Sequence, residues 1–423
     1  MFQKSSFLLF AIALCLSALA QDAPIRPRRG SKEVTPASAV TTPKEAKSRK
    51  FVLDVVNSAV ALPQSDQQDR LRVLNSAVEV MAPIAPKTAT ELSKEGIRIE
   101  SELIALGEKP AVSLFATGTV DCKTATEFAQ RIYPQNVGAA EQSLIGVLTS
   151  CPKQAGEIVR SRADGALSQN IVAPRLLMAL IEREPQNSSW AQRAFKAAFS
   201  SLPDKTGGEQ PNASEFATMF ATTAAKVDKD TVRDSGLKLF DWLGKQDDSG
   251  DKNLAINITA GAMKEQLGEE PYNRALERDA VAQSVARGEG AQGESSREEE
   301  ESVSVSQSMA TIAAGGDQRE ELKSLPPSMR ARQAAAYGFA KGTSGDQPGA
   351  ATYFDVAFSA ADEAWADRGN KNLAPLIQEV SEAAAQVDPM DALRRAQALQ
   401  DPSAKAIGMI AVARVVMSKN LQM

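Results

Sequence analysis

Two aspartates, Asp355 and Asp362, are the residues of this chain best placed for acid–base chemistry. They lie in the stretch YFDVAFSAADEAWAD, together with Glu363 and Trp365. On a helix the two carboxylates fall two turns apart on one face, close enough to flank a small substrate in a hydrolase or lyase built on a helical toroid. The alternative, which the surrounding pattern favours, is a solvated face opposite the apolar side of the helix, where Phe354 lies.

Cys122 and Cys151 form a second candidate pair. The chain has 3 cysteines, and the third, Cys15, lies near the N-terminus. Cys122 begins one predicted helix and Cys151 follows the next, with a turn at Tyr133–Gly138 between them. These two ends are neighbours in an antiparallel hairpin, so outside the cytoplasm we expect a disulfide, which stabilises the fold by about 3 to 4 kcal/mol. A nucleophilic thiol is the alternative, but the chain has no histidine to activate it.

A third group consists of Asp228, Asp230 and Asp234 in KVDKDTVRDSG. Three carboxylates at short spacing suggest a cation site. Lys229 and Arg233 are interleaved with them, however, and the spacing suits the cap and first turn of a helix better. We therefore predict a helix start here and no metal site.

Several residue types that enzymes commonly use are scarce or absent. The 423 residues include no histidine, 3 Trp and 4 Tyr, so His-based triads are excluded and stacking platforms for sugars or bases are few. No phosphate-binding loop, CxxC pair or GxSxG turn is present. A net charge of -5 gives no overall attraction to nucleic acid. We expect no cofactor, no metal and no nucleic-acid partner.

The N-terminus has the layout of an export signal. Lys4 precedes the apolar run Phe7–Leu16, and small residues follow before Gln21, so residues 1–20 are predicted to be a signal peptide. The run is too short for a stable membrane anchor. Cys15 as a lipid-bearing residue is the alternative, although Leu14 stands where a small residue is expected. The mature chain is predicted to be periplasmic or extracellular.

The rest of the chain is predicted to be all-α. Residues 21–50 are rich in Pro, Ser, Thr and charge and are predicted to be a disordered leader. Beyond them, apolar residues recur at intervals of three and four, and β-type alternation is absent. After early helices within 51–106, further helices are expected at about 111–117, 122–132, 138–150, 153–166, 172–184, 188–201, 212–227, 230–245, 252–267, 272–287, 350–368, 373–387 and 389–398.

An acidic segment divides these helices into two predicted modules. Residues 288–307 are rich in Gly, Ser and Glu, a composition typical of an extended linker. An acidic docking strip or a Ca²⁺-collecting segment is the alternative. The helices before this segment, 51–287, form the predicted N-terminal module, and 308–423 form the predicted C-terminal module.

The C-terminal module contains two related helix starts. PPSMRARQAAAYGFA (Pro326–Ala340) and DPSAKAIGMIAVARV (Asp401–Val415) share Pro-Ser-x-basic-Ala at an offset of 75 residues. Proline is favoured at the first helical position, and Asp401 is a predicted N-cap. The later copy has a broad face of small and apolar side chains, which predicts tight packing on two sides, as in a stacked helical hairpin.

The run VDPMDALRRAQALQDPSAKAIGMIAVARVV, Val387–Val416, resembles the tetratricopeptide- or HEAT-like helical repeats of uncharacterised secreted bacterial proteins. The likeness covers about the last hundred residues. It implies irregular helical-hairpin repeats of solenoid type and a non-enzymatic scaffold that binds another protein or peptide. The alternative function is the toroid hydrolase or lyase that uses Asp355 and Asp362.

Overall fold

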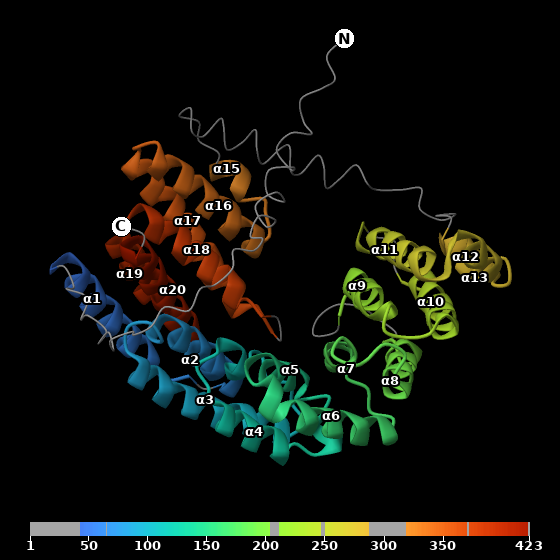
Figure 1. Cartoon of the computed structure of the whole chain (residues 1–423). Coiled ribbons are helices and arrows are strands. Elements are labelled where there is room, and N and C mark those ends of the chain that lie inside the picture. The colour runs from blue at the N-terminus through green and yellow to red at the C-terminus, as the bar shows by residue number, and fades with distance from the viewer. Residues whose placement is uncertain are drawn as a thin grey trace, which may run out of the picture. The chain divides into compact units, whose positions relative to one another are not determined.

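The computed structural model in Figure 1 describes residues 43–64, 66–203, 211–246, 250–286, 319–369 and 372–421. These residues contain helices and no strand, which confirms the predicted all-α class. The elements, in chain order, are α1 (Pro43–Val60), α2 (Gln67–Met81), α3 (Pro86–Ala105), η1 (Leu114–Thr117), α4 (Cys122–Arg131), η2 (Pro134–Asn136), α5 (Glu141–Ser150), α6 (Pro152–Ser168), α7 (Pro174–Ile181), α8 (Ser189–Ser200), α9 (Ala213–Ala224), α10 (Lys229–Gly244), α11 (Gly250–Leu267), α12 (Glu269–Leu276), α13 (Ala280–Ala286), α15 (Arg319–Leu322), α16 (Pro327–Thr343), α17 (Gln347–Ala366), α18 (Ala374–Val387), α19 (Pro389–Ala398) and α20 (Pro402–Leu421).

Some predictions lie outside the described residues. These are the signal peptide at 1–20 with Cys15, most of the leader at 21–50 and the acidic linker at 288–307. The end of the leader differs from the prediction, because α1 begins at Pro43. The stretch KEAKSRK that opens α1 consists mainly of residues with high helix propensity, so the helix extends back from its apolar positions into this polar segment.

The helix predicted at 272–287 is interrupted in the structure. It divides into α12 and α13, with Asp279 between them. The Asp279 carboxylate accepts hydrogen bonds from the backbone N–H groups of Val281 and Ala282, at 3.2 and 3.1 Å. A side chain that satisfies these donors starts a new helix, which a reading of apolar periodicity alone did not detect.

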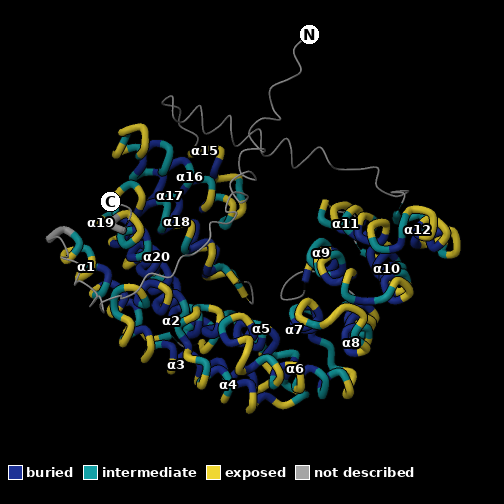
Figure 2. Tube along the Cα trace, viewed as in Figure 1, coloured by how far each residue is buried: buried dark blue, intermediate teal, exposed yellow. Residues whose placement is uncertain are grey.

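The buried apolar side chains form two clusters, and α2 contributes to both. Leu71 and Leu74 belong to the cluster that continues through α3 to α13. Val73 and Val80, on another face of α2, belong to the cluster built from α1, α2 and α15 to α20. All four side chains are fully buried, and Figure 2 shows buried positions along α2. The second cluster therefore draws on both predicted modules, whose boundaries stay a prediction.

Helix α20 is the most enclosed helix of the second cluster. It packs against α18 and α19, as the broad apolar face predicted, and also against α2 from the other end of the chain (Figure 1). A Cβ atom placed on Gly408 would lie 3.0 Å from Ser381 Oγ of α18 and 3.1 Å from Ala396 Cβ of α19. The small side chains of α20 therefore allow close approach to its neighbours.

The two related helix starts are confirmed. Helix α16 begins at Pro327 and α20 at Pro402, the equivalent positions of the repeated motif. Asp401 caps α20, because its Oδ1 accepts from the N–H groups of Ser403 and Ala404 at 2.8 and 3.1 Å. None of the helices within the described ranges is both long and apolar enough to cross a membrane.

Candidate functional site

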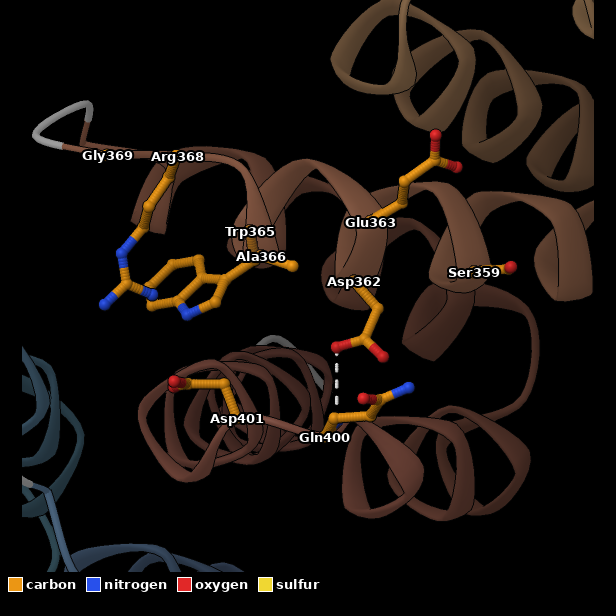
Figure 3. A pocket seen from close by; sticks show the side chains of 9 residues that line it. All are labelled: Ser359, Asp362, Glu363, Trp365, Ala366, Arg368, Gly369, Gln400 and Asp401. Atoms are coloured by element: carbon orange, nitrogen blue, oxygen red, sulfur yellow. Dashed lines mark hydrogen bonds between the residues drawn. The ribbon is translucent and has the colours of Figure 1, made fainter.

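A pocket lies where the C-terminal half of α17 faces the turn between α19 and α20 (Figure 3). Its volume is about 750 Å³. The residues that line it, here called the Trp365 pocket, are Ser359, Asp362, Glu363, Trp365, Ala366, Arg368, Gly369, Gln400 and Asp401. Three carboxylates and one guanidinium group make this lining acidic.

Each carboxylate of the Trp365 pocket is held by a hydrogen bond. Asp362 Oδ1 accepts from the backbone N–H of Gln400 at 3.1 Å, which ties α17 to the turn after α19. Asp401 is fixed by capping α20. Glu363 forms an ion pair with Arg330 of α16. The acidic lining is therefore positioned by the fold rather than by a bound ligand.

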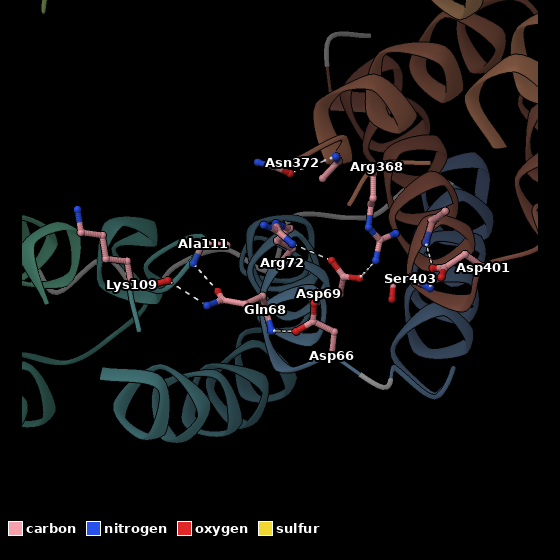
Figure 4. Close-up of polar contacts among 12 residues, drawn as sticks. Asp66, Gln68, Asp69, Arg72, Lys109, Ala111, Arg368, Asn372, Asp401 and Ser403 are labelled. Atoms are coloured by element: carbon pink, nitrogen blue, oxygen red, sulfur yellow. Dashed lines mark hydrogen bonds and ion pairs between the residues drawn. The ribbon is translucent and has the colours of Figure 1, made fainter. Parts of the chain in front are cut away.

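Arg368 covers one face of the Trp365 ring. Its guanidinium carbon lies 3.9 Å from the ring centroid, a cation–π contact. Its Nη2 donates to Asp69 Oδ2 of α2 at 2.7 Å, and Arg72 Nη1 donates to the other oxygen of Asp69 at 2.7 Å (Figure 4). Asp69 is only 2% exposed. This Arg–Asp–Arg group, in which the aspartate is buried, holds the wall of the pocket against α2.

The indole N–H of Trp365 is a buried donor in the lining of this pocket. The side chain is 3% exposed, and its Nε1 makes no hydrogen bond within the part of the chain that the structure describes. Figure 3 shows the ring between Arg368 and the turn at Asp401. Leaving a buried donor unpaired costs about 1 to 3 kcal/mol, so an acceptor from a ligand would recover that energy.

The structure separates the two aspartates that the sequence paired. Both face the α19 side of α17, but only Asp362 lines the pocket. Asp355 forms an ion pair with Arg395 of α19, a side chain that is 6% exposed and also bonded to Asp391. Arg395 lies 40 residues after Asp355, so the spacing within α17 gave no sign of this partner.

Cys122 and Cys151 lie together as predicted. Cys122 starts α4 and Cys151 follows α5, and their sulfur atoms are 2.07 Å apart, the distance of a disulfide bond. The hairpin argument from the sequence therefore identified the correct neighbours.

The Asp228 group forms a helix start, as predicted. Asp228 caps α10 by accepting from the N–H of Thr231 at 2.7 Å. Asp230 and Asp234 both bond to Arg233. Across the described ranges, no three acidic or cysteine side chains gather in a way that would hold a metal ion.

The pocket residues that the sequence did not single out are Ser359, Ala366, Arg368, Gly369 and Gln400. Arg368 follows Trp365 by three residues but lies just beyond the end of α17 at Ala366, so helical spacing could not have indicated the stacked pair. Gln400 carried no signal, because it contributes a backbone N–H. No protein-family model, curated protein or solved structure matches this chain, so its function has to be argued from its own geometry.

Proposed function

We propose that the protein is an exported, non-enzymatic helical-repeat scaffold, and that its Trp365 pocket binds a segment of another protein or peptide containing a lysine or arginine. The observation that carries this proposal is the buried Trp365 N–H, unpaired within the described residues, in the wall of an acidic pocket. Binding must first move the atoms that cover this N–H, and a peptide carbonyl then supplies the missing acceptor. Its cationic side chain meets the carboxylates of Asp362 and Asp401.

The position of Arg368 favours a peptide over a sugar. Carbohydrates bind proteins largely by stacking on an exposed aromatic face, whereas the Trp365 ring is buried and covered by Arg368. The part of Trp365 that can recognise a ligand is therefore its indole N–H, which lacks an acceptor among the described residues. A ligand with a carbonyl oxygen next to a positive charge fits that combination.

The hydrolase or lyase alternative has less support. It requires two carboxylates that share a substrate, as acid and base. Asp355 is paired with Arg395 and does not line the Trp365 pocket. Of this predicted pair, only Asp362 lines the pocket.

The wider architecture belongs to the same proposal. We take the helices as irregular hairpin repeats of solenoid type. Helix α16 packs along α17, and α20 packs against both α18 and α19. The proposal also includes two helical modules, at 51–287 and 308–423, and a periplasmic or extracellular location. The cysteine pair at disulfide distance supports export, since such pairs persist in oxidising compartments.

A display selection tests the proposal. A random peptide library is selected on the full mature chain, with counter-selection on the Asp362→Asn variant. We expect the selected peptides to be enriched in lysine or arginine, and we expect the Asp362→Asn variant not to retain them. Enrichment of sequences without basic residues, or equal retention by the variant, would overturn the proposal.

The matched control is Asp355→Asn. Asp355 lies on the same helix, is 70% exposed and is outside the pocket. Peptides selected on the native chain should bind this variant unchanged. A loss equal to that of Asp362→Asn would point to a general effect of charge instead of the pocket.

A further inference from the structure

A second pocket, of about 280 Å³, gathers three cationic side chains from distant parts of the chain. Arg72 comes from α2, Lys109 from the loop after α3, and Arg175 from the start of α7. Gly138 and Gln142, at the start of α5, also line it. This pocket, here called the Lys109 pocket, shares no lining residue with the Trp365 pocket.

The loop that carries Lys109 is held in place by Gln68. The side-chain amide of Gln68 donates to the carbonyl of Lys109 at 3.0 Å and accepts from the N–H of Ala111 at 2.7 Å (Figure 4). Lys109 itself forms no ion pair with any residue that the structure describes. The backbone of Lys109 is therefore held in place, and the charge of its side chain stays available to a ligand.

Arg72 presents a donor that no described residue satisfies. Its Nη1 is bound to Asp69, which fixes the guanidinium group, but its Nε is buried and makes no hydrogen bond within the described ranges. Because Asp69 also binds Arg368, the group of two arginines and one aspartate keeps a net positive charge. An anion beside the Arg72 guanidinium group would offset that charge.

The start of α5 adds to the positive potential. Ala140 occupies the N-cap position and provides no side-chain cap, so the first N–H groups of the helix lack that partner. Gly138 and Gln142 on either side of this position line the pocket. The N-terminus of a helix attracts anions, and here it adds to three side-chain cations.

Glu141 is the one acidic residue in the lining, and its carboxylate is engaged by backbone N–H groups of α7. Glu141 Oε1 accepts from the N–H groups of Arg175 and Leu176, at 2.9 and 3.3 Å, and so caps α7. Burial raises the pKa of Glu141, against the opposing effect of the nearby Lys109 and Arg175. Glu215 already pairs with the Arg175 side chain, which leaves Lys109 and Arg72 as the principal ligands of an anion.

We propose that the Lys109 pocket binds a small oxyanion, a carboxylate or phosphate group. Its small volume suits one such group rather than a polyanion. This proposal does not rest on the peptide site, because the two pockets share no lining residue, although Asp69 bonds to an arginine of each.

Thermal unfolding in the presence of anions tests the site. Inorganic phosphate and acetate are each added at millimolar concentrations to the full mature chain, with sodium chloride at matched ionic strength as reference. A ligand that binds only the folded chain raises Tm with its concentration. We expect phosphate or acetate to raise Tm above the chloride reference, and the more effective anion identifies the group.

Lys109→Gln is the decisive variant, because it removes one cation and leaves the hydrogen bonds of Asp69 and Glu141 in place. We expect it to weaken the apparent affinity for the anion about ten-fold, the loss of one charge-assisted hydrogen bond. The control is Lys123→Gln, which removes a lysine that is 86% exposed on α4 and should respond like the native chain. No anion-specific rise in Tm, or an equal rise in Lys109→Gln, would overturn the proposal.

Discussion

Glu100 of α3 is a carboxyl group with no exposed surface, in the middle of the first apolar cluster. Its Oε2 accepts from the N–H of Leu114 at 3.2 Å, and its other oxygen accepts from the hydroxyl of Ser143. It thereby links α3 to η1 and α5. Burial raises its pKa from 4.5 to about 7, despite these hydrogen bonds.

The pKa of Glu100 predicts how stability depends on pH. The folded chain holds this proton more tightly than the unfolded chain, so the contribution of Glu100 to the free energy of unfolding is highest below about pH 4.5 and falls until about pH 7. The loss amounts to about 3 kcal/mol. Glu100→Gln should remove this decline and be more stable than the native chain at pH 8, since an amide accepts from Leu114 without carrying a charge.

Urea unfolding at several pH values measures this effect. Glu102→Gln serves as control, because it removes a partly exposed carboxylate from the same helix. If Glu100→Gln keeps the native pH profile, or loses stability at pH 8, the account of Glu100 is wrong.

For individual residues, the sequence indicated which side chains could do chemistry but not which residues they would bond to. Asp355 and Asp362 were correctly placed on one face of α17, yet the partner of each comes from a separate helix or turn. Asp401 was recognised as a cap because its partners follow within three residues. Local hydrogen bonds could therefore be predicted, while contacts across the fold could not.

Among the elements, α16 and α18 show how closely the helices pack. A Cβ atom placed on Gly342 of α16 would lie 2.5 Å from both γ-methyl groups of Val387, at the end of α18. Valine has one strongly preferred rotamer in a helix and cannot turn aside easily. Gly261 of α11 offers the contrast, because nothing lies within 4 Å of an added Cβ atom there.

These two glycines predict opposite effects of the same substitution. Gly261→Ala should raise the free energy of unfolding by up to about 1 kcal/mol, the gain in helix propensity. Gly342→Ala makes the same gain in helix propensity but pushes α16 away from α18. This overpacking costs about 1 to 3 kcal/mol, so the free energy of unfolding should fall. Chemical denaturation of both variants measures the difference. Stabilisation by Gly342→Ala would mean that the helices can move apart without cost.

The apolar face of α20 shows what periodicity can and cannot indicate. Its breadth predicted neighbours on two sides, and α18 and α19 were expected from the preceding hairpin. The contact with α2 was missed. A second apolar stripe on α2, which includes Val73 and Val80, was the available sign that this helix is buried on two faces.

In the whole molecule, the two ends of the described chain share one core. Helices α1 and α2 pack with α15 to α20, and Arg414 of α20 bonds to Glu79 of α2 at 2.9 Å across 335 residues. The composition change at 288–307 predicted a linker but carried no information on which helices meet beyond it. Pairing between distant apolar faces is not specific enough to be read from one sequence.

The shared core predicts that the two predicted modules stay together after cleavage. A protease site inserted between Arg297 and Glu298 allows the folded chain to be cut inside the predicted linker. Because Val52, Val73 and Ile410 are buried in the same cluster, the fragments should elute together in gel filtration without denaturant. Separate elution of two folded fragments would show that this core does not hold them together.

The Trp365 pocket as a peptide site is the central claim, and the affinity of one selected peptide for four chains tests it most directly. Fluorescence anisotropy would compare the native chain with Asp362→Asn, Trp365→Phe and Asp355→Asn. We predict a loss of about ten-fold for each of the first two, which remove one hydrogen-bonding or charged partner, and no change for the third. Equal affinity for the native chain, Asp362→Asn and Trp365→Phe would contradict the claim, as would a loss for Asp355→Asn as large as that for Asp362→Asn.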